Sequence, residues 1–209
     1  MSTKRCAFGL AAVCGRLYAI GGWNSEGVSG ALGSVEAYDP RLGFWAPVAS
    51  MSTGRYDFAS VVLDGKIYAI GGYGGTGDDY VLHSVEVYEP QANSWQRVAS
   101  MPRGLFKFAA AAMDGKIYVT GGETEYEDAV NSVYVYDLQA DAWTQLSDMG
   151  TGRQLHASAL VGGKLYVFGG RGGDHVDLST AEVYDPASDS WAQGSSLTSA
   201  RRAFGLVAL

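Results

Sequence analysis

Short apolar runs alternate with glycine-rich turns along the whole chain, and the same order of runs recurs four times. One copy reads Asp-Gly-Lys-Ile-Tyr-Ala-Ile-Gly-Gly from Asp64, continues through a glycine- and aspartate-rich loop to Ser-Val-Glu-Val-Tyr-Glu-Pro, and ends at Asn-Ser-Trp. Self-similarity at such a period is typical of repeat architectures. We therefore interpret residues 1–209 as one repeat domain, with repeats at about 1–50, 51–100, 101–148 and 149–196 and a partial fifth repeat at 197–209.

Each repeat is predicted to contain four strands, a to d. Strand a is a short apolar run rich in small residues, and a two-residue turn such as Asp64-Gly65, where glycine accepts a positive φ, leads into strand b. Strand b ends at a glycine doublet, strand c ends at a tyrosine, and strand d begins at a tryptophan. The runs assigned to strand a are Phe8–Val13, Phe58–Leu63, Phe108–Met113, Ala157–Val161 and Phe204–Leu209.

No segment keeps a helical period, so the sequence predicts an all-β fold. Four-stranded units repeated around an axis are the blades of a β-propeller. We expect four four-stranded blades plus a fifth innermost strand. Because that last strand has no b, c or d strand after it, we expect the propeller to be incomplete.

The length variation of the repeats is confined to one loop. The glycine doublet is followed by the tyrosine after 16, 16, 14 and 14 residues, whereas tyrosine and tryptophan are always seven residues apart. Constant segments indicate a packed scaffold, and loops that vary are where binding is usually carried. Since the strands alternate in direction, the b–c and d–a loops lie on one face, which we predict to be the functional face.

An arginine opens strand a in four of the five copies, at Arg5, Arg55, Arg153 and Arg201, and Leu105 stands in its place in the third. Guanidinium groups at these positions would bind a carboxylate or phosphate through paired hydrogen bonds. The prediction is that they form a partner-binding ring, with an apolar subsite at Leu105 together with the neighbouring Phe106 and Lys107. A structural role, in which each arginine pairs with a carboxylate or backbone of an adjacent blade, stays open.

The b–c loops add aromatic and charged candidates for partner binding, and tyrosine and tryptophan are favoured at binding hot spots. They are Trp23, Tyr73, Tyr80, Tyr126, Arg171 and His175. The alternative for each is a solvated loop residue. Glu36, Glu86 and Glu182 recur in strand c, and we interpret them as structural.

Charge and motifs exclude several classes of function. The net charge of −7 argues against nucleic acid or an anionic membrane surface as a partner. The three histidines fall in different repeats without metal-ligand spacing, so we expect no metal, cofactor or catalytic residue. Cys6 and Cys14 are too far apart along one expected strand to pair, which favours a reducing compartment, cytoplasmic or nuclear.

The strand ending in Gly-Gly, followed by Tyr and then Trp at fixed spacing, resembles the kelch repeat over the whole chain. The tight form, Met-x-x-x-Arg-x-x-Phe through Asp-Gly-Lys-Ile-Tyr-Ala-Ile-Gly-Gly to Ser-Val-Glu-Val-Tyr-x-Pro, is most similar to the BTB-kelch (kelch-like) adaptor proteins. The resemblance implies a non-enzymatic protein-interaction module that holds an acidic partner segment on its arginines.

The same resemblance implies service as the substrate receptor of a cullin-type ubiquitin ligase. Binding of cullin-ligase components would need a BTB domain outside these 209 residues. Two alternatives come with the kelch family: an enzyme acting on a sugar or another small molecule, and an actin-binding scaffold.

Overall fold

Four antiparallel four-stranded sheets and one two-stranded sheet make up the computed structural model, which describes residues 1–25, 30–74, 80–126 and 128–205. Sheet 1 contains β1 (Gly9–Val13), β2 (Arg16–Ile20), β3 (Val35–Asp39) and β4 (Phe44–Val48). Sheet 2 contains β6 (Ala59–Leu63), β7 (Lys66–Ile70), β9 (Val85–Glu89) and β10 (Ser94–Val98). Sheet 3 contains β11 (Ala109–Met113), β12 (Lys116–Thr120), β13 (Val133–Asp137) and β14 (Ala142–Leu146). Sheet 4 contains β15 (Ala157–Val161), β16 (Lys164–Phe168), β17 (Ala181–Asp185) and β18 (Ser190–Gly194).

The strands predicted from the repeat pattern are confirmed, because each sheet follows the order a-b-c-d. Asp64 and Gly65 take φ values of 49° and 73°, as a tight hairpin turn requires, and Ala59 pairs with Ile70 across that hairpin. The fifth strand predicted at Phe204–Leu209 falls mostly outside the described residues. Across the described ranges no helix occurs, and so none could span a membrane.

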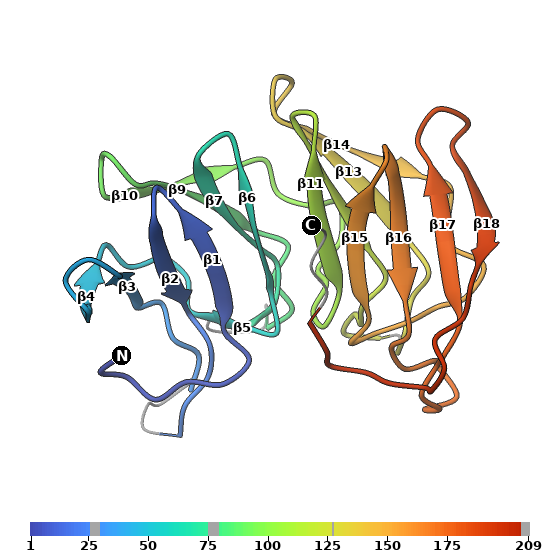
Figure 1. The fold of residues 1–209 in the computed structure, drawn as a ribbon, viewed down its shortest axis with the longest axis horizontal. Helices are drawn as coiled ribbons and strands as arrows, with labels where there is room; N and C mark the ends of the chain where they lie inside the picture. Colours follow the sequence, from blue (N-terminus) through green and yellow to red (C-terminus); the bar gives the residue numbers. More distant parts are fainter. Residues whose placement is uncertain (26–29, 75–79, 127, 206–209) are drawn as a thin grey trace. The chain divides into compact units, whose positions relative to one another are not determined.

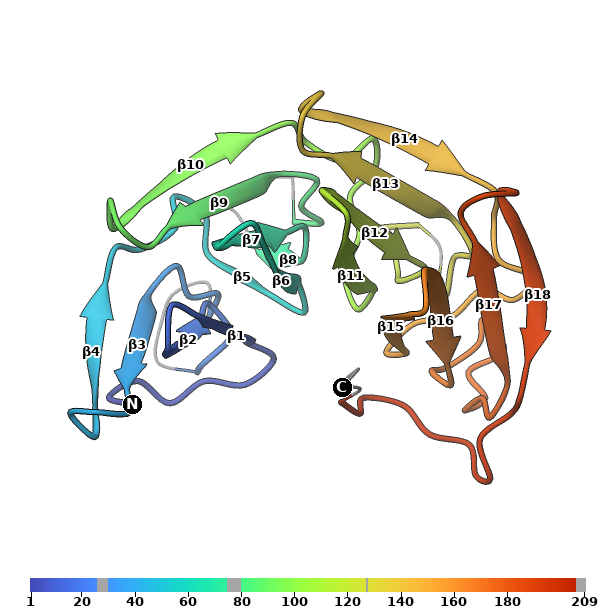
Figure 2. The same cartoon turned by 45° about the horizontal axis from the view of Figure 1, so that its top comes forward.

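The chain divides into two compact units, Met1–Phe106 with sheets 1 and 2 and Lys107–Leu209 with sheets 3 and 4. We call them unit 1 and unit 2. In each unit the a strands lie side by side on the inside, and the d strands lie outermost (Figures 1 and 2).

Alternation along the strands gives each sheet two faces. The forward face of sheet 1 carries Tyr18, Ile20 and Ala37, and its rear face carries Leu17, Tyr38 and Trp45, which are cross-strand neighbours. In unit 1 the forward face of sheet 1 packs on the rear face of sheet 2, where the ring of Tyr18 meets that of Tyr88 at 5.6 Å.

Unit 2 repeats this packing. Tyr118 and Val135 on the forward face of sheet 3 pack against Leu165 and Tyr184 on the rear face of sheet 4. The rings of Tyr118 and Tyr184 lie 6.4 Å apart. Among the described residues, no second sheet of the same unit packs on the rear face of sheet 1 or on the forward face of sheet 4.

Within each unit, the repeated tyrosine and tryptophan join the rear face of the second sheet to the first sheet. Asn93 accepts hydrogen bonds from the Tyr88 hydroxyl (2.8 Å) and from the backbone N–H of Ala49 (2.9 Å), and the Trp95 indole donates to the Ala49 carbonyl (2.9 Å). In unit 2, Asp189 accepts from Tyr184 and Ser147 in the same way, and Trp191 donates to the Ser147 carbonyl. These aromatic residues are therefore scaffold.

Candidate functional site

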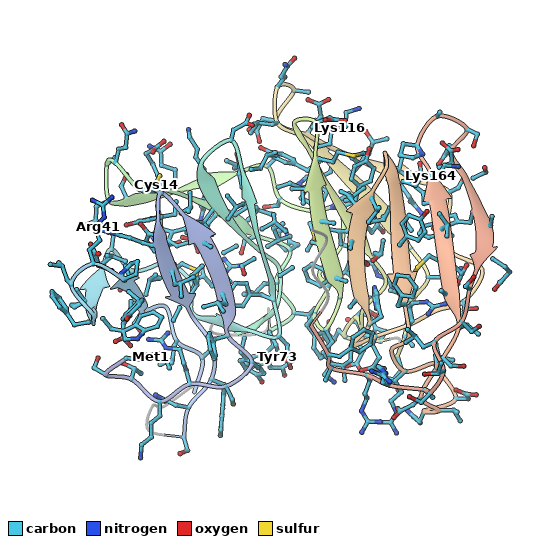
Figure 3. The ribbon with its side chains drawn as sticks, viewed as in Figure 1. Met1, Cys14, Arg41, Tyr73, Lys116 and Lys164 are labelled. Atoms are coloured by element: carbon cyan, nitrogen blue, oxygen red, sulfur yellow. The ribbon has the colours of Figure 1, made fainter. Side chains whose placement is uncertain are left out.

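The b–c and d–a loops meet at one end of each unit, which we call the loop face. In unit 1, Tyr73 lies at this end, and Cys14, in an a–b turn, lies at the opposite end (Figure 3). The end predicted to carry function therefore exists as a distinct surface in each unit.

A short backbone ladder supports the loop face, and its pairing is seen most fully in repeats 1, 2 and 4. In repeat 2, β5 (Arg55–Tyr56) pairs with β8 (Tyr73–Gly74), and Tyr73 also bridges to Val81 on the returning loop. The same positions pair in repeat 1 through Cys6, Trp23 and Ala31, and in repeat 4 through Gln154, Arg171 and Asp177. We call these residues the loop-face ladder. The backbone pattern is constant while the side chains differ, so each repeat presents different chemistry on the same frame.

Repeat 2 places four aromatic side chains together on this frame. The ring of Tyr73 lies 5.4 Å from Tyr56, 5.4 Å from Phe106 and 6.0 Å from Tyr80, which it meets at an interplanar angle of only 13°. We call these residues the Tyr73 cluster. Tyr80 is 49% exposed and the other three are half-buried.

Tyr56 of the Tyr73 cluster carries no charge at physiological pH. Burial raises the pKa of the Tyr56 hydroxyl, and the neighbouring Tyr73 and Asp57 raise it further. Uncharged tyrosines present a rigid apolar ring and a hydroxyl that can donate and accept, which is the chemistry of a protein-binding anchor.

Repeat 1 adds an open hollow to the loop face of unit 1. The hollow has a volume of about 370 Å³, and Trp23, which is 40% exposed, forms part of its wall. Its lining residues are Lys4, Arg5, Cys6, Trp23, Asn24 and Ser25. The sequence-predicted Trp23, Tyr73 and Tyr80 are thus all accessible on the loop face of unit 1.

Unit 2 carries charged groups at the same ladder positions. The Arg171 side chain donates to the backbone carbonyl of His175 (2.8 Å), and Asp177 pairs with Arg202. The His175 ring lies 3.6 Å from an Asp128 carboxylate oxygen. Arg171 and His175 therefore lie together on the loop face of unit 2, with Asp177 and Asp128 beside them. Tyr126 stands apart and is 85% exposed.

The prediction that Arg5, Arg55 and Arg153 form a binding ring is wrong. The three arginine side chains have no exposed surface. Arg55 donates to the carbonyls of Gly71 (2.7 Å) and Ser84 (3.0 Å) and to the Glu86 carboxylate (2.9 Å). A guanidinium enclosed in this way cannot reach a partner.

The same set of bonds recurs around Arg5 with Glu36 and around Arg153 with Glu182. The structural alternative is therefore correct, except that the carboxylate belongs to the same repeat and not to an adjacent one. The interpretation of Glu36, Glu86 and Glu182 as structural is confirmed.

Hydrogen bonding keeps the enclosed Glu36 ionised. Desolvation raises its pKa, but bonds from the backbone N–H groups of Ser2 and Thr3 and from Arg5 outweigh burial and lower the pKa to about 2. Arg201 differs from the other arginines because it is exposed, and it donates to the Ser199 hydroxyl at 2.7 Å. Leu105 is fully buried, so it forms no apolar subsite.

His156, the buried histidine of unit 2, is part of the packing between sheets 3 and 4. Its Nε2 lies 2.9 Å from the Thr120 hydroxyl, which lies 3.0 Å from the Ser158 hydroxyl. Burial and the charge of Arg153 lower the pKa of His156 to about 3, so the ring is neutral. Within the described part of the chain, no group of three or more His, Cys, Asp or Glu could hold a metal ion. Cys6 and Cys14 are exposed free thiols.

Comparisons with known proteins agree with this architecture. Residues 100–207 match the family described as the KLHDC2/KLHL20/DRC7 Kelch-repeats domain, and residues 4–52 and 54–102 each match the Kelch motif. Among solved structures, that titled "Structure of YjhT" is similar with a TM-score of 0.82 and 18% sequence identity, over 96% of this chain and 73% of that one. A comparison with curated proteins gave no significant match.

Proposed function

This chain belongs to the kelch-repeat family, and we propose that it is a non-enzymatic protein-recognition module that binds a segment of a partner protein on the loop face of unit 1. Its sheets are the blades of a kelch-type β-propeller, a fold consistent with protein interaction. The observation that carries the proposal is the Tyr73 cluster. Its four aromatic side chains gather at positions where the packing of the sheets does not require an aromatic residue.

The energetics favour an anchor at this place. Half-buried aromatic rings lose little conformational freedom on binding, because their neighbours already hold them. The adjoining hollow beside Trp23 offers room for a second anchor on the same unit. Support for a non-enzymatic role comes from the groups with large pKa shifts, Glu36, His156 and Tyr184, which all belong to buried scaffold contacts.

The expected preference for an acidic segment has no arginine to support it at this site, because the side chains of Arg5 and Arg55 are buried. Arg171 and Arg201, which keep exposed surface, belong to unit 2. Service as a substrate receptor of a cullin-type ubiquitin ligase rests on the resemblance to kelch-like adaptors. Residence in the cytoplasm or nucleus is supported by the two exposed free thiols.

Selection from a displayed peptide library tests the proposal. Wild-type protein should enrich a family of related peptides, and the variant Tyr73→Ala/Tyr80→Ala should bind the enriched peptides at least about tenfold more weakly, as expected for the loss of hot-spot aromatics. Phe44→Ala is the matched control, because Phe44 is an aromatic residue of the same unit that is 53% exposed on the outer strand β4. Equal binding by the double variant, with equal folding, would rule out the Tyr73 cluster as the binding site.

A further inference from the structure

The ring faces of the Tyr73 cluster have a charge preference of their own. An aromatic face carries the negative part of the ring quadrupole, so it attracts a cation and does not attract a carboxylate. The ring of Tyr73 makes interplanar angles of 13° with Tyr80, 45° with Tyr56 and 67° with Phe106. Ring faces of several orientations therefore surround Tyr73 at the loop end of unit 1 (Figure 3).

Tyr80 offers the most accessible ring of the cluster. It stacks on Tyr73 with the ring centroids 6.0 Å apart, and 49% of its surface stays exposed. A guanidinium is planar and more weakly hydrated than an ammonium, so it stacks on an aromatic face at a smaller cost in lost hydration. The tyrosine hydroxyls can accept hydrogen bonds from its N–H groups.

Negative charge adjoins the cluster. Asp57 directly follows Tyr56, and its carboxylate lies near enough to raise the pKa of the Tyr56 hydroxyl, in addition to the larger effects of burial and of Tyr73. The loop from Tyr73 to Tyr80 contains two further aspartates, which lie outside the described residues, and neither lysine nor arginine. The charge of the neighbouring Arg55 is compensated within the scaffold. These charges favour a cationic ligand.

The matching positions of unit 2 carry cations instead. On the ladder of repeat 4, Arg171 stands at the position of Tyr73, and Arg202 stands at that of Phe106. Two guanidinium groups would repel a basic ligand there. The backbone frame is the same in both units, so the preference for a cation belongs to the side chains of unit 1.

We infer that the Tyr73 cluster binds an arginine side chain of the partner segment, so that the partner is basic at this point. The inference rests on the proposed function and names the chemistry of the bound segment. The guanidinium stacks on Tyr80, donates to a tyrosine hydroxyl and lies in the electrostatic field of Asp57. This preference is the opposite of the acidic one expected from the arginines at the start of strand a.

The displayed-library selection that tests the proposed function also tests this inference. The enriched peptides should share an arginine. In a selected peptide, citrulline in place of that arginine keeps the shape and removes the charge, so it should weaken binding about tenfold. Lysine keeps the charge but loses the planar stacking, and it should weaken binding about threefold.

Variants of the protein then place the arginine. Tyr80→Leu removes the ring face and should bring the arginine and citrulline peptides to within about twofold of each other in affinity, whereas Tyr80→Phe keeps the face and most of the difference. Asp57→Asn should weaken binding of the arginine peptide and leave the citrulline peptide unchanged. Asp57 has a φ of 50°, which asparagine tolerates, so the variant should fold.

Asp64→Asn is the matched control for Asp57→Asn. Asp64 is exposed in the a–b turn of repeat 2, at the opposite end of unit 1, and its φ of 49° is nearly the same. The same substitution there should leave the affinities for both peptides unchanged. Circular dichroism checks that every variant is folded.

The outcomes separate this inference from the proposed function. Selected peptides that depend on Tyr73 and Tyr80 but share no arginine, or bind equally well with citrulline, overturn the inference and leave the proposed function standing. A difference between arginine and citrulline that survives both Tyr80→Leu and Asp57→Asn also overturns it, because the guanidinium then lies elsewhere. Peptides that bind independently of both tyrosines, or a selection that enriches none, overturn both.

Discussion

At the scale of single residues, the third repeat shows what the arginine–glutamate pair does. Leu105 replaces the arginine, Tyr134 replaces the glutamate, and Pro102, which has no N–H, stands where Ser2, Ser52 and Gly150 donate to the carboxylate. The hydroxyl of Ser132, which would accept from the missing arginine, is buried without a hydrogen-bond partner. In repeat 3 the arginine, the glutamate and the backbone donor to the carboxylate are therefore all replaced together.

Removing one member of the pair should be costly, because it leaves a buried charge uncompensated. We predict that Arg153→Leu lowers the free energy of unfolding by about 3–5 kcal/mol. Arg153→Leu/Glu182→Tyr should recover part of this loss, and adding Gly150→Pro should recover more, since it removes a donor that has lost its acceptor. Urea denaturation of the three variants measures the series. A double variant less stable than the single one would contradict this account.

A second residue-scale prediction concerns acid stability. The pKa of His156 is about 3 in the folded chain and about 6.5 when unfolded, so only the unfolded state takes up a proton between these values. Stability is thus fully present above pH 6.5 and falls as the pH drops below it. The expected loss from this residue between pH 7 and pH 5 is about 2 kcal/mol.

The variant His156→Phe/Thr120→Ile isolates this effect, because it installs the residues found at Phe58 and Ile20 in unit 1. Urea denaturation at pH 7 and pH 5 should show a smaller loss for the variant than for wild type. Glu36 does not interfere, since its pKa falls from about 4.5 to about 2 on folding and its contribution is lost only below pH 4.5. An equal loss in both proteins would show that His156 is not the group responsible.

At the scale of elements, the long strands could be predicted and the short ones could not. Each five-residue strand carries a periodic apolar pattern and a turn signal, so its position follows from the sequence. β5 and β8 have two residues each, too few for a pattern, and their pairing depends on the glycine doublet, which lets two backbones approach.

We expect alanine substitution to cost different amounts of stability at two glycines of positive φ, Gly72 in the glycine doublet and Gly65 in the hairpin turn. A Cβ on Gly72 (φ 96°) would lie 2.5 Å from the Cβ of Phe58 and 2.8 Å from the Tyr56 carbonyl oxygen, whereas one on Gly65 (φ 73°) would meet nothing within 4 Å. We expect Gly72→Ala to cost about 3 kcal/mol of stability, from strain and overlap together. Gly65→Ala should cost about 1 kcal/mol, from strain alone. Similar costs in thermal or urea denaturation would mean that the close approach at the ladder is unimportant.

At the scale of the whole molecule, the sequence located the loop face but not all of the residues that lie on it. Loop-length variation separated the loop face from the scaffold, and Trp23, Tyr73 and Tyr80 lie accessible there. The prediction for the arginines was wrong because the sequence alone does not show whether a guanidinium at the start of strand a faces solvent or a buried carboxylate. The signal that could have decided the matter is the joint loss of arginine and glutamate in repeat 3. Phe106 was expected only beside Leu105, and its contact with Tyr73 could not be predicted because only the fold brings the two rings together.

The central claim is that recognition and scaffold are carried by separate residues, and one measurement tests it most directly. The affinity of a selected peptide and the free energy of unfolding are determined for wild type, Tyr73→Ala/Tyr80→Ala and Arg153→Leu/Glu182→Tyr. The account predicts that the tyrosine variant loses at least about tenfold in affinity with little change in stability. The arginine variant should lose stability and, where folded, keep its affinity. Unchanged affinity in the tyrosine variant, together with lost affinity in the folded arginine variant, would contradict the account.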